Sequence, residues 1–164
     1  MIYRAITILR SLGLAGLLRA AKRRLFELMA GKSKAFTLHR DMFLGKSGIE
    51  IGGPSATFSK RGIFPIYPVV ENIDNANFST DTIWEGTITS GRTFRFDAAK
   101  PLGKQYICEA TSMDAIPSAS YDFVLSSHTL EHCANPLSAL SEWRRVLRNN
   151  GLLALLLPDK RFTF

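Results

Sequence analysis

The sequence predicts an α/β fold built on a mostly parallel sheet of about five strands with flanking helices. Short apolar runs typical of buried strands recur along the chain, and glycines or small polar residues follow them. The two clearest runs are residues 49–51, which break into Gly52, Gly53 and Pro54, and residues 123–125, which end in two serines before a long amphipathic stretch. Because open α/β sheets bind ligands at the carboxyl ends of their strands, these polar gaps predict a binding edge.

A chain of 164 residues is long enough for one domain with a substantial core. Its hydrophobic content of 46% and charged content of 21% are typical of globular proteins and exclude a disordered chain. The two cysteines, Cys108 and Cys133, each lie in or beside an apolar stretch and do not form a disulfide framework. We interpret both as ordinary core thiols of a protein in a reducing, cytoplasmic compartment.

The net charge of +7 is concentrated at one end of the chain. Residues 1–40 contain nine Lys or Arg and a single acid, Glu27, for a net charge of +8, whereas the remainder has 12 basic and 13 acidic residues, for a net charge of −1. The part of the chain that carries the strand signals is therefore close to neutral. Any attraction to an anionic partner is expected to come from the N-terminal segment.

We divide the chain into a basic helical N-terminal segment with its linker, residues 1–44, and an α/β domain, residues 45–164. Residues 1–30 are rich in Leu, Ile and Ala, which favours helix, but interrupting arginines make them too charged to span a bilayer. Two interpretations stay open: a helical cap packed on the sheet domain, or a peripheral anchor on the anionic inner face of a membrane. Nucleic acid is less favoured as a partner, because no aromatic platform or known binding module accompanies the charge.

The first predicted strand, residues 47–51, carries Glu50 and ends in the glycine bend. Only a short helix is expected over residues 56–60, because a glycine and two prolines follow. The second predicted strand, residues 69–74, ends in Asp74. Asp74 lies 21 residues after Gly53. Nucleoside-binding α/β folds place an acid that binds the ribose hydroxyls at about this spacing.

The middle of the chain is less regular. We expect a short helix over residues 78–85, assign nothing over residues 86–101, and predict the third strand over residues 104–110. Asn135 is placed to cap the helix after the fourth strand, and the core-facing positions of that helix recur at three- and four-residue spacing: Leu137, Leu140, Trp143, Val146 and Leu147.

Residues 149–151 are expected to end this helix, and residues 152–157 form a fully apolar fifth strand. Without a neighbour beyond it, this strand would be an exposed apolar edge through which the protein could self-associate.

The chain resembles the class I S-adenosylmethionine-dependent methyltransferases, in particular the methyltransferase type 11-like domains, over residues 47–160. The resemblance is carried by the strand, Ser-Ser-His, Leu-Glu-His and Arg-Val-Leu positions of a late motif: Asp122, Ser126, Ser127, His128, Leu130, Glu131, His132, Asn135, Pro136, Arg145, Val146, Leu147 and Gly151. The chain departs from the pattern at Asn150 and at the glycine bend. The family fold is Rossmann-like with seven strands, so the resemblance implies a domain that is incomplete at its C-terminus.

The resemblance implies S-adenosyl-L-methionine as the cofactor and a set of residues to bind it: Glu50, Gly52, Gly53, Pro54, Asp74, Glu109, Ala110 and Ser127. Either His128 or His132 could act as a general base if the methyl acceptor is a hydroxyl. The alternative is that His128 contributes only its backbone and His132 only caps or packs locally. One short His and Cys cluster does not predict a metal site.

Two functions follow from the sequence. The first is a methyltransferase that acts on a small-molecule or glycan-like acceptor. The second is a truncated or non-catalytic relative that binds S-adenosylmethionine and serves as an interaction protein. A dinucleotide oxidoreductase is disfavoured, because the bend lacks a third glycine and a helix N-terminus aimed at a pyrophosphate. The expected location is cytoplasmic, with peripheral contact to the inner membrane face as the alternative for the basic segment.

Overall fold

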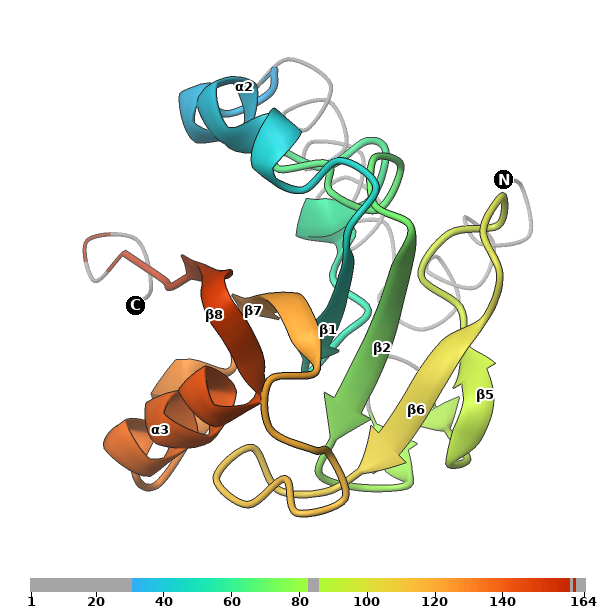
Figure 1. Ribbon diagram of the computed structural model, residues 1–164, viewed down its shortest axis with the longest axis vertical. Helices are drawn as coiled ribbons and strands as arrows, with labels where there is room; N and C mark the ends of the chain where they lie inside the picture. The colour runs from blue at the N-terminus through green and yellow to red at the C-terminus, as the bar shows by residue number, and fades with distance from the viewer. Residues whose placement is uncertain (1–30, 83–85, 160, 162–164) are drawn as a thin grey trace, which may run out of the picture.

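The computed structural model describes residues 31–82, 86–159 and 161 (Figure 1). The helical prediction for residues 1–30 lies outside these residues. None of the helices in the described part of the chain is long and apolar enough to cross a membrane.

Six strands form one twisted sheet in the order β5-β6-β2-β1-β7-β8 (Figure 1). Five of them run parallel to one another: β1 Ser47–Ile51, β2 Asn72–Asn77, β6 Gly103–Ile107, β7 Tyr121–Ser127 and β8 Leu147–Leu156. The sixth, β5 Gly91–Phe94, lies antiparallel on β6 at one edge, in the stretch left unassigned from the sequence. The predicted mostly parallel α/β sheet is confirmed, and β8 forms its other edge.

Few helices connect the strands. The described helices are α2 Lys34–His39, η1 Arg40–Met42, η2 Ala56–Phe58, η3 Leu130–His132 and α3 Pro136–Val146. The single turn η2 is all the helix between β1 and β2, as Gly62, Pro65 and Pro68 predict. A helix over residues 78–85 is wrong for the described part, where β3 Asp81–Thr82 pairs with β4 Gly86–Thr87.

Two hydrophobic clusters cover the two faces of the sheet. Successive strand residues point to opposite faces, so Val124 packs in one cluster and its neighbours Phe123 and Leu125 pack in the other. The cluster on the α2 side is aromatic and includes Phe36, Phe43, Phe58, Phe64, Tyr67, Phe94, Phe96 and Phe123. The cluster on the α3 side includes Ile49, Ile51, Met113, Ile116, Val124, Trp143 and Val146.

Two predicted strand boundaries are wrong. The Val69 and Val70 amides both donate to Ile66 O, so the apolar pair forms a turn, and β2 starts at Asn72 and continues three residues past Asp74. At the other end, α3 stops at Val146 and β8 begins at once, five residues earlier than predicted, with a register shift against β7. Asn150, at φ 62°, lies inside β8 and does not end the helix.

Candidate active site at the carboxyl edge of the sheet

Strands β1, β2, β6 and β7 run in the same direction (Figure 1). The residues at and after their carboxyl ends line a cavity of about 1040 Å³. The residues that follow each strand form its walls, as expected for an open α/β sheet. The cavity is lined by Ile51, Gly52, Pro54, Ser55, Ala56, Thr57, Ala76, Asn77, Phe78, Cys108, Glu109, Ala110, Thr111, Ser127, His128, Thr129, His132, Cys133, Ala134, Asn135 and Ser138.

The bend after β1 has its backbone amides turned inward. Gly52 N donates to Ala76 O at 2.9 Å, Gly53 N to Asn75 Oδ1 at 3.1 Å, and Ser55 N to Glu50 Oε1 at 3.0 Å. Pro54 has no amide hydrogen. The glycine-rich loops that cradle phosphates do so with free amides, so this bend is not built as a phosphate cradle.

A buried row of polar side chains holds the bend from behind. Glu50, Asn75 and Gln105 are register partners on β1, β2 and β6, and each is at most 2% exposed. Asn75 Nδ2 lies 3.2 Å from Gly53 O and 3.0 Å from Gln105 Oε1, and Tyr67 donates its hydroxyl to Glu50 Oε2 at 2.5 Å. Glu50 and Gly53 therefore shape the wall without lining the cavity. Asn75 and Gln105 were missed from the sequence, where their only signal is a polar residue inside a strand.

Both glycines of the bend are required by their surroundings. Gly52 adopts φ +81°, and a Cβ there would lie 2.5 Å from Thr129 Oγ1. A Cβ on Gly53 would overlap the carboxylate of Glu50. Thr129 also donates its hydroxyl to Ile51 O at 3.0 Å, which ties the loop after β7 to the end of β1.

Asp74 lies away from the cavity, because β2 continues to Asn77. The carboxylate of Asp74 accepts from Lys104 N at 2.8 Å and from the Tyr121 hydroxyl at 2.7 Å. Burial, followed by hydrogen bonding with Tyr106 and Asp74, raises the pKa of Tyr121 well above its ordinary value. Asn77 and Phe78 occupy the strand-end position that the sequence assigned to Asp74.

The other predicted residues meet at the cavity. Glu109 and Ala110 follow β6, and Ser127, His128 and His132 lie at or beyond the end of β7. The Oγ of Ser127 is buried and has no hydrogen-bond partner among the described residues. Within the described chain no group of His, Cys, Asp or Glu is arranged to hold a metal ion.

His128 has an unusual backbone and an acidic neighbour. Its φ is +57°, its amide donates to Leu156 O at 3.1 Å, and its Nδ1 lies 3.4 Å from Glu131 Oε1. The side chain is 60% exposed on the cavity side of the loop. The Nε2 atom is therefore the ring nitrogen that remains for a ligand.

The described walls of the cavity carry negative charge. They include Glu109 but neither Lys nor Arg, although the chain contains 21 such residues. Burial, Glu109 and other nearby carboxylates raise the pKa values of the Cys108 and Cys133 thiols, which therefore stay protonated at neutral pH. This environment favours a cationic or neutral ligand over a phosphorylated one.

Residues 83–155 match a model of a methyltransferase domain family. Among solved structures, a protein of Bacillus halodurans C-125 assigned as a methyltransferase superposes with a TM-score of 0.52 at 18% identity, over 73% of this chain and 48% of that one. A protein of Anabaena variabilis assigned as a methyltransferase from an antibiotic biosynthesis pathway has a TM-score of 0.52 at 16% identity, over 79% and 47% of the two chains.

A Haloferax volcanii protein assigned as a methyltransferase, solved in complex with the Trm112 methyltransferase activator, has a TM-score of 0.51 at 14% identity, over 84% and 54% of the chains. No curated protein matches the sequence. The chain spans about half the length of the solved structures it matches. Residues 83–155 therefore resemble a methyltransferase domain, and the strand order together with the likeness to the solved structures shows a Rossmann-like fold.

Proposed function

We propose that the protein is an S-adenosyl-L-methionine-dependent methyltransferase that acts on a small-molecule or glycan-like acceptor. The observation that carries the proposal is the chemistry of the cavity: a glycine bend whose amides are all committed internally, and described walls with a carboxylate but neither Lys nor Arg. S-adenosylmethionine has no phosphate and carries a positive sulfonium, so it fits these walls better than a dinucleotide does.

The proposed cofactor site uses three strand ends. Gly52, Pro54 and Ser127 would bound the methionine end, and Asn77, rather than Asp74, would face the ribose hydroxyls. Glu109 and Ala110 would hold the adenine edge. Glu50 and Gly53 would act from behind by fixing the bend. When bound, the cofactor supplies an activated methyl group on its sulfonium sulfur, and the chain's task is to align the acceptor and exclude water.

For a hydroxyl acceptor we propose His128 as the general base. Its Nε2 would take the acceptor proton, and Glu131, on the Nδ1 side, would stabilise the resulting imidazolium. His132 lines the same cavity and is the second candidate. Replacing His128 with Gln would leave cofactor affinity unchanged and lower the transfer rate about 100-fold or more. If replacing His132, and not His128, lowers the transfer rate, His132 is the general base.

Calorimetric titration tests the proposal. S-adenosylmethionine and S-adenosylhomocysteine should bind, whereas NAD, which carries a pyrophosphate, should not.

Gly52→Val should abolish binding, because its Cβ would overlap Thr129 and its φ is unfavourable for a branched residue. Normal binding by a folded Gly52→Val protein would place the site elsewhere. Binding without methyl transfer to any of a panel of hydroxylated acceptors would favour the non-catalytic alternative.

Partners beyond the acceptor are a separate proposal. The Haloferax neighbour binds a protein activator, which supports a search for a protein partner here. Strand β8 lies at a sheet edge among the described strands, which supports a test for self-association by analytical ultracentrifugation. Peripheral membrane contact through the basic N-terminus remains the third candidate.

A further inference from the structure

The loop between β6 and β7 forms one wall of the cavity and contains no helix. It runs from Cys108 to Ser120, and its first four residues line the cavity. Such a loop cannot satisfy its own backbone groups as a helix would, so it needs partners elsewhere. Apart from Met113 and Ile116, which are fully buried, its interior part is held mainly through polar contacts to α3.

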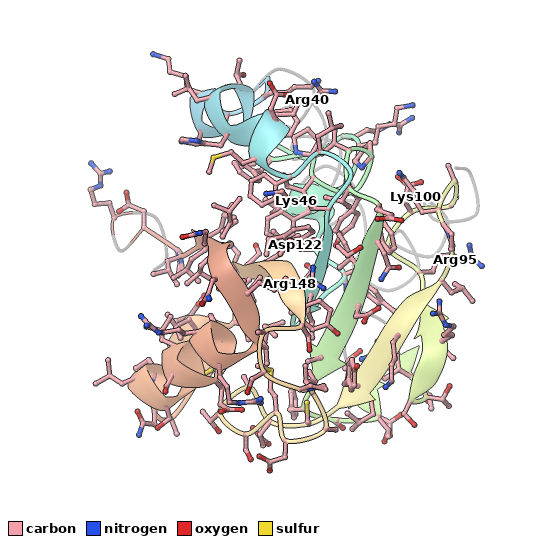
Figure 2. All side chains as sticks on the ribbon, viewed as in Figure 1. Arg40, Lys46, Arg95, Lys100, Asp122 and Arg148 are labelled. Atoms are coloured by element: carbon pink, nitrogen blue, oxygen red, sulfur yellow. The ribbon has the colours of Figure 1, made fainter. Side chains whose placement is uncertain are left out.

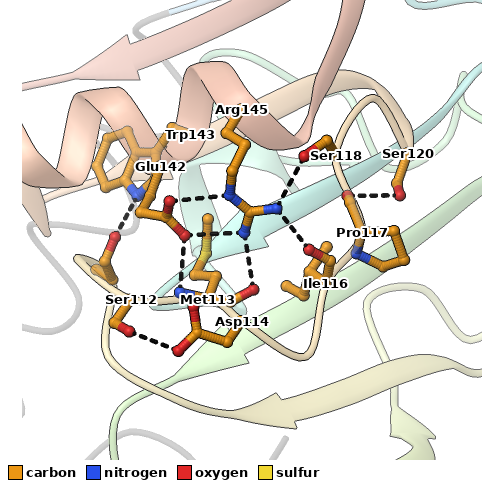
Figure 3. A network of polar contacts seen from close by, with 11 residues as sticks. Ser112, Met113, Asp114, Ile116, Pro117, Ser118, Ser120, Glu142, Trp143 and Arg145 are labelled. Carbon is orange, nitrogen blue, oxygen red and sulfur yellow. Dashed lines mark hydrogen bonds and ion pairs between the residues drawn. The ribbon is translucent and has the colours of Figure 1, made fainter.

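Glu142 and Arg145 of α3 bind this loop as one unit (Figure 3). The two side chains pair through two hydrogen bonds of 2.9 and 2.8 Å. Glu142 accepts from Met113 N at 2.9 Å, and Arg145 donates to Met113 O at 2.9 Å and to Ile116 O at 2.8 Å. The hydrogen bonds to Arg145 lower the pKa of Glu142, so the pair stays charged at neutral pH.

Trp143 reaches the cavity wall itself. Its indole is fully buried in the α3-side cluster, and its Nε1 donates to Ala110 O at 3.1 Å. Ala110 and its neighbour Glu109 both line the cavity. Asn135 and Ser138, at the amino end of α3, also line the cavity, so this helix borders the cavity and also holds the loop between β6 and β7.

We propose that Glu142, Trp143 and Arg145 are positioning residues, which hold residues 108–111 in the shape that receives the nucleoside end of the ligand. This inference rests on the proposed function for the identity of that ligand. The positioning of residues 108–111 does not depend on the proposed function, because hydrogen bonds within the chain produce it. None of the three side chains lines the cavity, so each acts through the loop.

The alkylation rates of Cys108 and Cys133 measure how firmly residues 108–111 are held. Cys108 lies on the held loop, whereas Cys133 follows η3, outside that loop, and serves as an internal reference. Trp143→Phe keeps most of the ring packing and removes the N–H donor. We expect it to raise the rate of iodoacetamide alkylation at Cys108 about 2- to 10-fold relative to Cys133, the factor that corresponds to one lost hydrogen bond. Mass spectrometry of the two peptides measures both rates in one sample.

Arg145→Lys provides a second variant if Trp143→Phe does not fold. The lysine keeps the positive charge but lacks the planar guanidinium that donates to two carbonyl oxygens. The alkylation rate of Cys108 should therefore rise in this variant as well. Arg144→Lys, an exposed position on the same helix, is the matched control and should change neither rate. An unchanged Cys108 rate in a folded variant, or equal increases at both cysteines, would overturn the inference, because the second result reports general loosening.

Ligand titration separates this inference from the proposed function. Adenosine and S-adenosylmethionine share the nucleoside end, so Trp143→Phe should weaken both by the same factor of about 2 to 10. Weaker S-adenosylmethionine binding with unchanged adenosine binding would contradict the inference. If the wild-type protein binds neither ligand while Cys108 still becomes more reactive, the proposed function fails and the hold on the wall stands.

Discussion

Glu50 illustrates how a residue can serve a site without facing it. Both of its oxygens accept hydrogen bonds, from the Tyr67 hydroxyl at 2.5 Å and from Ser55 N at 3.0 Å, and the residue is completely buried. A buried carboxylate needs such donors, because burial without them is costly. Its effect on ligand binding is therefore expected to be indirect, through the shape of the bend that carries Gly52.

Gly53→Ala should disturb this bend. The new Cβ would overlap the Glu50 carboxylate in a fully buried site, which we expect to cost about 1 to 3 kcal/mol of stability and to weaken S-adenosylmethionine binding. Thermal unfolding and calorimetric titration measure the two effects. Gly86→Ala, in an exposed hairpin, controls for loss of stability alone: its Cβ meets nothing within 4 Å but its φ of +76° disfavours a side chain, so it should lower stability and leave the affinity unchanged. Normal affinity in Gly53→Ala would contradict this account of the bend.

Asp122 should contribute stability that is lost in acid. Asp122 and Arg148 point toward one another near Lys46 (Figure 2), with an Arg148 Nη1 to Asp122 Oδ1 distance of 2.6 Å, and Ser47 N donates to Asp122 Oδ2 at 3.0 Å. Burial alone would raise the pKa of Asp122. The hydrogen bonds from Ser47 and Arg148 and the two nearby cations outweigh it, and the pKa falls below its ordinary value of 3.8.

A depressed folded-state pKa stabilises the protein above the unfolded-state value, and this stabilisation disappears as pH falls through the folded-state value. Wild type should therefore exceed Asp122→Asn in stability by about 1 kcal/mol at neutral pH, and the difference should shrink below pH 3.8. Urea unfolding at several pH values measures it. A difference that is constant down to the acid limit would show that the carboxylate charge plays no part.

At the scale of elements, α3 connects the hydrophobic core to the cavity. Its buried residues are Ala139, Trp143 and Val146, whereas Leu137, predicted to face the core, is 77% exposed. The buried face begins at Ala139, two residues after Leu137, and the first turn borders the cavity through Asn135 and Ser138. Asn135 caps the helix by accepting from Ser138 N at 3.1 Å, as predicted.

Removing this cap should loosen α3. We expect Asn135→Ala to cost about 1 kcal/mol and to lower the melting temperature by roughly 2 to 4 °C. Asn135→Asp, which keeps an acceptor at the same position, should melt close to the wild type. Differential scanning calorimetry of the three proteins compares them. Equal losses in both variants would mean that Asn135 stabilises the protein in some way other than as a cap.

At the scale of the molecule, positive charge and the cavity are separated. The net charge of residues 1–40 is +8, while the cavity walls described above carry a carboxylate and neither Lys nor Arg. The α/β domain therefore has no electrostatic reason of its own to approach an anionic surface. Phe36 and Phe43 of residues 31–44 belong to the core, so a deletion that tests the basic segment should stop at residue 30.

Deletion of residues 1–30 removes six of the nine basic residues of residues 1–40. It should strongly reduce sedimentation with anionic vesicles at low salt and leave S-adenosylmethionine affinity intact. Basic residues near an anionic leaflet contribute about 1 kcal/mol each, and salt screens this attraction. Neutral vesicles and high salt are the controls for the full-length protein. A large fall in melting temperature on deletion would favour the helical cap, and a full-length protein that ignores anionic vesicles would exclude the anchor.

The sequence by itself determined the fold class, the glycine bend and the late Ser-Ser-His motif, because short apolar runs, glycine and proline act locally. Glu109, Ala110, Ser127 and the two histidines could be placed at the binding edge because they follow strands at its carboxyl end. Local signals also located Asn135 as a helix cap.

Only the tertiary structure decided which strand-end residue faces the cavity. The valines before β2 look like strand but form a turn, so Asn77 replaces Asp74 at the cavity. Glu50, Asn75 and Gln105 lie far apart in the sequence, and only the register of three neighbouring strands brings them into one row. The hold of Trp143 on Ala110 joins residues 33 positions apart. Contacts of this kind depend on how elements pack, and no local pattern encodes them.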